Sequence, residues 1–446
     1  MNNSSRRYRH LALWVGGLSE RYPKSYLGFT LVLMALGYVF IFMFPYFAFA
    51  SISILIEQLA TVPIMQQSAM TWVWVSVLIV CSLVSWQIFK LHFPRTQGLK
   101  LSRQQVPELF ELVAGVGKFT LQPAVRNIVL TGQYELRIEQ TPRFGFPFCS
   151  NNTLVLGLPM LQTLSEEQFR CELMHRLSQY ASGRFRPSHW VFRTRLLWRR
   201  YLDALTKNKR FGDFPIRWFF AVYTPLFELL TLPAVRADEL AGDSTVLEWV
   251  NDRDYFDALM SSTFASLFLE GHYWRQVYQT ALKNSKSALT PFADLEHISG
   301  HLNSKEFRRK WLQGAFAADQ NYSKAMPTLR TRMENIGQSK LRVGPIIENT
   351  AAQILLGDAR KNIVSIIDKL WCSTTFMRWK TEHRKHRENV KTVKEISRKS
   401  RRKIVSVTEV LHYARLVKQL RGDSLRSSYA KMFKRNLRNS LPFSLN

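Results

Sequence analysis

Residues 164–183 hold the side chains whose types and spacing come closest to a catalytic motif. His175 and Gln179 lie four residues apart, so on a helix they share one face. A zinc-hydrolase helix carries two histidines at this spacing as metal ligands, with a glutamate beside the first as general base. Here Arg176 stands in the place of that glutamate, and Gln179 stands in the place of the second histidine.

The neighbouring segments must position this helix. Ser165, with Gln168 three residues on, predicts a capping box at its start. The spacing of apolar residues predicts an amphipathic helix over 102–119, and alternation predicts strands within 124–136. A short apolar run at 153–157 predicts a further strand just ahead of the central helix.

Two long apolar stretches near the N-terminus predict a membrane hairpin. Residues 25–56 carry no charge, and the predicted spans are 27–50 and 70–89. A helix needs about 20 apolar residues to cross a bilayer, and both runs meet that length. The alternative is a pair of buried core helices, but soluble helices this long normally have one charged face. Pro45 is expected to kink or end the first span.

The charges that flank the spans predict their orientation. The N-terminal segment 1–25 is rich in Arg and Lys, and further basic residues follow the second span. The only charged residue in the loop between the spans is Glu57. The positive-inside rule then places both termini and the following domain in the cytoplasm.

The composition is strongly basic, with 446 residues and a net charge of +29. This charge indicates an anionic partner such as a membrane surface or nucleic acid. The tail 380–446 has 19 Lys and Arg against five Asp and Glu, and its apolar residues fall at helical spacing. We expect the tail to contact anionic inner-leaflet lipid. The alternative is that the tail is a helix whose basic face is solvated or binds a protein. Binding of nucleic acid is less favoured, because no recognition motif supports it. None of the four cysteines forms a CxxC pair, so neither a disulfide framework nor a thiolate zinc site is indicated.

Four segments together carry a family resemblance. They are TPRFGFPFCSNNTLVLGLPMLQTLSEEQFR, HWVFRTRLLW, RADELAGD and MPTLRTRMENIG, the last with Met326 in the place of a family histidine. In order and spacing the chain resembles the membrane-anchored zinc peptidases of the HtpX and CAAX-prenyl-protease type. The similarity covers roughly 141–238 and extends weakly to about 387.

The resemblance implies an α+β, mostly helical fold: a zincin-like domain with a small β-sheet, on a transmembrane hairpin in the bacterial inner membrane. The domains expected are a basic cytoplasmic N-terminus 1–25, the hairpin 26–90, the zincin-like domain 100–335, a helical extension 336–379 and the basic helical tail 380–446.

The chain departs from the family pattern at the metal site. The family ligand positions are His175, Gln179 and Ala234, of which only the histidine is retained, and the base position is occupied by Arg176. A further family histidine is Arg184 here, whereas the acid Asp238 is kept. Active family members hold zinc; no metal and no cofactor is expected in this chain, because one imidazole, one amide and one methyl group do not make a catalytic zinc site. The expected vestigial site comprises His175, Arg176, Gln179, Arg236 and Asp238.

These departures favour a pseudopeptidase, a membrane-anchored scaffold or polypeptide-binding protein whose partner is an unknown polypeptide. We expect Arg176 or Arg236 to pair with Asp238 or with a neighbouring acid such as Glu172. One alternative is a zinc metalloendopeptidase with an atypical site, using His189 or another histidine and acting in membrane protein quality control; another is a membrane-surface structural protein. Strand addition would place a bound peptide at an edge strand made of Thr153, Leu154, Val155, Leu156 and Gly157.

Overall fold

The computed structural model describes residues 3–416 except 62–68, 95, 120–124, 144–145, 181–186, 208–212, 284–288, 299–303, 319–325, 346, 403–405, 407, 410 and 414. Arg184 and residues 417–446 of the basic tail therefore lie outside the described residues, as does the side chain of Cys149.

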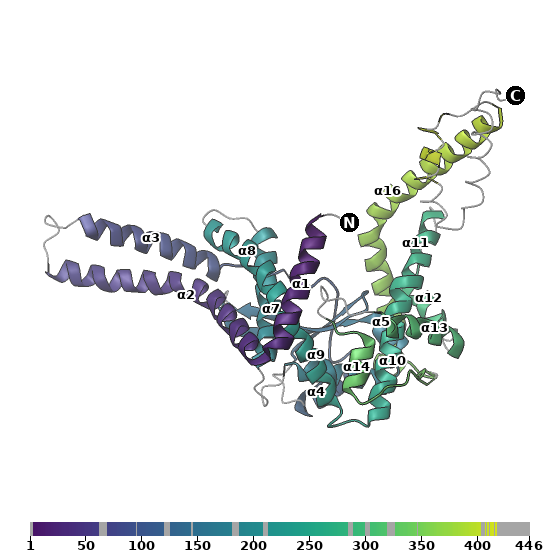
Figure 1. Cartoon of the computed structure of the whole chain (residues 1–446), viewed down its shortest axis with the longest axis horizontal. Coiled ribbons are helices and arrows are strands. Elements are labelled where there is room, and N and C mark those ends of the chain that lie inside the picture. Colours follow the sequence, from purple (N-terminus) through teal and green to yellow (C-terminus); the bar gives the residue numbers. More distant parts are fainter. Residues whose placement is uncertain are drawn as a thin grey trace. The chain divides into compact units, whose positions relative to one another are not determined.

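The described chain is mostly helical, with one small sheet and two long apolar helices near its N-terminus (Figure 1). The strands are β1 (Leu99–Leu101), β2 (Asn127–Thr131), β3 (Leu136–Arg143) and β4 (Phe146–Gly157). The helices are α1 (Asn3–Arg21), α2 (Pro23–Thr61), α3 (Ala69–Phe89), α4 (Pro107–Phe119), α5 (Leu158–Thr163), α6 (Glu166–Ser178), α7 (Pro187–Lys207), α8 (Phe214–Leu230), α9 (Leu232–Val246), α10 (Asp252–Phe268), α11 (Trp274–Lys283), α12 (Pro291–Ile298), α13 (Lys305–Phe316), α14 (Leu329–Asn335), α15 (Ala351–Leu355) and α16 (Arg360–Arg402), with a π-helical turn at Leu269–Tyr273 and a 3-10 turn at Gly357–Ala359.

The chain divides into two units. The first comprises residues 1–269 and 292–367, and it holds the apolar hairpin, the sheet and α4–α10. The second comprises residues 270–291 and 368–446. Within the second unit Trp274 of α11 stacks on Trp371 of α16, with ring centroids 5.9 Å apart, and the Cys372 thiol lies 3.1 Å from the carbonyl oxygen of Leu289.

The sheet has the order β1-β2-β4-β3, so β4 lies inside it. β4 pairs in parallel with β2, Leu154 opposite Ile128, and antiparallel with β3, Leu154 opposite Ile138. The prediction that 153–157 is an exposed peptide-binding edge is therefore wrong. Both sides of this segment are paired, and β3 is the edge strand on that side of the sheet.

The two apolar helices α2 and α3 lie side by side (Figure 1). Each is long and apolar enough to cross a membrane, and the predicted spans 27–50 and 70–89 lie within them. Pro45 lies inside α2 and does not end it. Figure 1 shows that α2 changes direction along its length, as a proline inside a helix favours.

The apolar hairpin joins the rest of the first unit through an aromatic core. Trp198 and Tyr201 of α7 and Phe220 of α8 are almost fully buried, and they pack with Ile41 of α2 and Ile88 of α3. Each such side chain contributes about 1.5–3 kcal/mol when it is removed from water. This core holds α7 and α8 against the base of the hairpin.

Candidate functional site

Helix α6 carries the residues that the sequence singled out, and it begins as predicted. The Ser165 hydroxyl accepts the backbone N–H of Gln168, and the Gln168 side chain accepts the backbone N–H of Ser165. Phe169, Leu173 and Leu177 are fully buried. The helix packs against α9, α10 and β3, so its last turn, with His175 and Arg176, faces α9 inside the protein.

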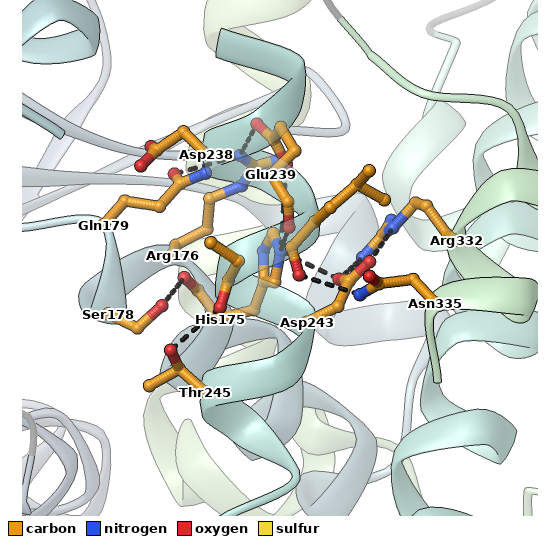
Figure 2. A network of polar contacts seen from close by, with 12 residues as sticks. His175, Arg176, Ser178, Gln179, Asp238, Glu239, Asp243, Thr245, Arg332 and Asn335 are labelled. Atoms are coloured by element: carbon orange, nitrogen blue, oxygen red, sulfur yellow. Dashed lines mark hydrogen bonds and ion pairs between the residues drawn. The ribbon is translucent and has the colours of Figure 1, made fainter. Parts of the chain in front are cut away.

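The side chain of His175 is 1% exposed, and its ring contacts polar atoms of α9. Its Nε2 lies 3.0 Å from Oδ1 of Asp243 and 3.1 Å from the carbonyl oxygen of Glu239 (Figure 2). Both partners accept hydrogen bonds, so Nε2 carries the hydrogen. A Cβ at residue 242 would lie 2.9 Å from the same nitrogen, so the close approach of α9 to the imidazole requires the glycine found there.

Asp243 is the centre of a buried network and has no exposed surface. Arg332 of α14 binds it with two hydrogen bonds, Nε to Oδ2 at 3.0 Å and Nη2 to Oδ1 at 2.6 Å, and the Tyr255 hydroxyl donates to Oδ1 at 2.5 Å. Burial by itself would raise the pKa of Asp243, but the Arg332 guanidinium, with the His175 hydrogen bond, holds it well below its usual range. The carboxylate is therefore ionised at neutral pH and fully bonded.

Arg176 pairs with Glu239, one residue away from the predicted partner. Its Nη1 donates to Glu239 Oε1 at 2.7 Å and lies 3.3 Å from Oε1 of Gln179 (Figure 2). Burial raises the pKa of Glu239, but the Arg176 guanidinium, with His175 and Arg332, lowers it to about 2. We expected Arg176 to pair with Asp238 or with a neighbouring acid such as Glu172; the acid is Glu239, which follows Asp238 in the chain, and the pair joins α6 to α9.

Asp238 binds a histidine instead. His189 Nε2 of α7 lies 2.9 Å from Asp238 Oδ1, and the Ser188 hydroxyl lies 3.4 Å from the same oxygen. Asp238 has no exposed surface, and burial raises its pKa, with His189 acting in the opposite direction. His189 is thus a partner of Asp238, and Arg236 lies half-buried on α9 two residues earlier.

The remaining predicted site positions are apart from this network or only touch it. Gln179 is fully buried at the end of α6, and its Nε2 has no hydrogen-bond partner in the described part of the chain. Ala234 belongs to the apolar core with α2, α7 and α8. Met326 is 45% exposed.

The two ion pairs at the centre of the network balance in charge. Arg176 and Arg332 contribute two positive charges, and Glu239 and Asp243 contribute two negative charges. Within the described ranges, no group of three or more His, Cys, Asp or Glu side chains is placed to hold a metal ion. The arrangement supplies a bonded network that ties α6, α9 and α14 together.

A cleft of about 530 Å³ opens beside this network. Its walls come from the edge strand β3, the end of α6 and one face of α7. Cationic side chains outnumber acids in its lining, with Arg137, Arg176, Arg193, Arg199, Arg200 and Lys207 against Glu139 and Asp203. Arg176 and Gln179 line both the cleft and the network.

Four residues of the network were not predicted as site residues: Glu239, Asp243, Tyr255 and Arg332. Two signals were available in the sequence. Glu239 and Asp243 are four residues apart, so a helix places both on one face. Arg332 stands in the segment MPTLRTRMENIG, which carried part of the resemblance.

Comparisons of the chain with models of protein families, with curated proteins and with solved structures find no match.

Proposed function

We propose that the protein is a membrane-anchored, catalytically inactive relative of the HtpX-type zinc peptidases, with a zincin-like domain that binds polypeptide at the inner face of the membrane. One observation carries this proposal. At the position equivalent to the family's general base, the Arg176 guanidinium lies 2.7 Å from Glu239, beside the one retained ligand, His175.

The electrostatics of that contact oppose a zinc ion at this place. Two charges about 4 Å apart, at the effective dielectric of a protein surface, interact by about 4 kcal/mol, so Arg176 would repel a dication by roughly twice that amount. His175 Nε2 is already bonded to α9. Without a zinc ion a water molecule at this place is not made more acidic, and position 176 offers no carboxylate to take its proton.

The cleft beside β3 supports polypeptide binding, and its details favour recognition through side chains. The outward carbonyl oxygens of Ile138 and Gln140 on β3 already accept hydrogen bonds from Tyr180 and Arg200, at 3.0 and 2.9 Å. A strand added at this edge would have to displace both donors. The basic and apolar lining of the cleft offers ion pairs and apolar contacts that require no such displacement.

The membrane part of the proposal follows from the two apolar helices and the charges around them. Lys90 follows α3 directly, and α1 ends at Arg21. We therefore place the domain and both termini on the inner side, in the inner membrane of a bacterium, with the basic tail against anionic lipid.

Metal content tests the loss of catalysis. The full chain, purified in nanodiscs after growth with added zinc, should hold far less than one zinc per chain and should leave casein intact. Stoichiometric zinc, with chelator-sensitive cleavage that His175→Ala abolishes, would instead establish the rival function, a zinc endopeptidase of membrane protein quality control.

A cleft-filling variant tests the binding role. Leu196 lines the cleft, and Leu196→Trp should weaken binding of fluorescein-labelled unfolded casein to the nanodisc-bound chain at least tenfold by anisotropy. Ile354→Trp is the matched control, because Ile354 is 39% exposed and does not line the cleft. Equal binding by both variants would exclude the cleft, and no binding by the unmodified chain would favour the structural-protein alternative.

A further inference from the structure

Helix α8 has an exposed apolar face that none of the residues in the described chain covers. Phe214, Trp218, Val222 and Leu226 recur every four residues and are 64, 64, 58 and 47% exposed. Residues at this spacing form one stripe along a helix. Large apolar side chains exposed in a row along a helix form a contiguous patch, and such a patch marks a surface that meets an apolar partner.

The charged residues of α8 turn away from this stripe into ion pairs. Arg217 binds Asp213 at 3.0 Å, and Glu228 binds Arg199 of α7 at 3.0 Å. The stripe itself contains no charged residue. An apolar face without charge, on a helix whose charges are paired elsewhere, fits lipid better than water.

Helix α8 packs along α2, one of the two candidate membrane helices. Phe219 stacks on Phe40 with ring centroids 3.7 Å apart, and the Tyr223 hydroxyl donates to the carbonyl oxygen of Leu33 at 2.6 Å. Further along α8, the Tyr26 hydroxyl of α2 donates to the carbonyl oxygen of Leu230. The two helices are therefore antiparallel neighbours over residues 26–40 of α2.

This part of α2 has an exposed stripe of the same kind, made of Phe29, Val32, Leu36 and Val39. Residues 26–40 belong to the uncharged run of α2 that makes it a candidate span. The apolar face of α8 is thus continuous with a helix that is itself apolar enough for a bilayer.

The geometry excludes a complete crossing by α8. Its 17 residues make about 25 Å, less than the roughly 30 Å of a hydrocarbon core. At Thr231 the chain bends by 52° into α9. α9 cannot continue a span, because Asp238, Glu239 and Asp243 on it are buried in the polar network of the domain.

We infer that α8 is a third membrane-contacting element, seated in the leaflet nearest the domain, with Phe214, Trp218, Val222 and Leu226 against phospholipid acyl chains. This inference rests on the membrane location of the hairpin in the proposed function. The domain would then be attached to the membrane through α8 as well as through the hairpin. Because α8 also shares the aromatic core with α7, its contact with lipid would hold the domain against the membrane surface.

Spin-label accessibility tests the inference on the full chain. The four native cysteines are replaced, single cysteines are introduced by Trp218→Cys or Val222→Cys, and the nitroxide-labelled chain is placed in phosphatidylcholine–phosphatidylglycerol nanodiscs. Labels at both positions should collide several-fold more with oxygen, which partitions into lipid, than with a water-soluble nickel chelate. Both positions are exposed, so the labels should leave the far-UV circular dichroism unchanged; if one variant fails to fold, the other carries the test.

Two control positions separate the possible failures. Ile354→Cys, on α15, should behave as a site in water, and Ile79→Cys, 54% exposed on α3, should behave as a site in lipid. Water-like labels on α8 with a lipid-like label at residue 79 would overturn the inference and leave the anchor intact. A water-like label at residue 79 would overturn the membrane anchor itself. Labels on α8 shielded from both reagents, with spin–spin broadening, would show that a second copy covers the stripe and would also overturn the inference.

Discussion

Replacing Arg176 with methionine probes the contact between α6 and α9. Glu239 is 3% exposed, and after Arg176→Met its carboxylate would remain buried, with the Arg332 guanidinium and the His175 ring near it. Its pKa of about 2 lies about 2.5 below its ordinary value of 4.5. At about 1.4 kcal/mol for each pKa unit, this difference corresponds to about 3–4 kcal/mol of stability.

We therefore expect Arg176→Met to lower the free energy of unfolding by about 3–5 kcal/mol, the usual result of removing one partner of a buried ion pair. Urea unfolding of the full chain in micelles, followed by circular dichroism, measures this change. The matched control is Arg170→Met on the same helix, because Arg170 pairs with Glu166 at 2.8 Å while remaining 47% exposed. That exposed pair should contribute about 0.5 kcal/mol or less.

The pH dependence has a defined sign. A carboxyl whose pKa is lowered in the folded state contributes stability above its unfolded pKa and loses it as the pH falls through the folded value. The contribution of Glu239 should thus fade between about pH 4.5 and about pH 2, and in Arg176→Met the fading should be smaller. Equal losses in the variant at 176 and in the control at 170 would refute the reasoning, as would strict additivity between Arg176→Met and Glu239→Gln.

Two further outcomes concern the buried acids, and a third concerns the orientation of the apolar hairpin. Arg332→Met should cost at least as much as Arg176→Met in the urea assay, because it removes two hydrogen bonds from Asp243, which has no exposed surface; a smaller loss than that of Arg176→Met would contradict this. Asp238→Asn should leave the free energy of unfolding unchanged or raise it at neutral pH. The raised pKa of Asp238 means that the folded state disfavours the ionised carboxylate, so the folded state loses stability as the pH rises through that pKa. A loss of more than about 2 kcal/mol at pH 7, absent at pH 4, would show that the His189 contact outweighs burial. A reporter fused to the C-terminus should be cytoplasmic and one within residues 62–68 external, and the reverse pattern would contradict the proposed orientation.

The local features of the fold were predictable, because they depend on residues close together in the chain. The two apolar runs predicted α2 and α3, and Ser165 with Gln168 predicted the start of α6. The helix predicted over 102–119 begins at residue 107, where a proline fits the first helical turn, which needs no N–H donor.

The order of the strands was not predictable in the same way, because it depends on long-range pairing. Residues 153–157 were expected to form an edge, yet Leu154, Val155 and Leu156 have no exposed surface. A continuous apolar run is typical of a strand that is covered on both faces, and this signal favoured the centre of the sheet over its edge.

The acid that pairs with Arg176 could not be identified from the sequence alone. The segment RADELAGD correctly predicted that the partner lies on α9, but Asp238 and Glu239 are adjacent on this helix and point about 100° apart. Only the packing of α6 on α9 decides which of the two meets the guanidinium. The structure turns Glu239 toward Arg176 and Asp238 toward His189.

Charge balance connects the altered motif with the observed network. Around His175 two guanidiniums and two carboxylates are paired at 2.6–2.7 Å with little exposed surface. A glutamate at position 176 would lower the net charge by two, which is the charge that a zinc ion supplies. Arginine at position 176 supplies from the chain itself the positive charge that pairs with the buried Glu239 carboxylate. With arginine at this position, ion pairs from Arg176 to Glu239 and from Arg332 to Asp243 connect α6, α9 and α14, and their strength depends on pH and burial.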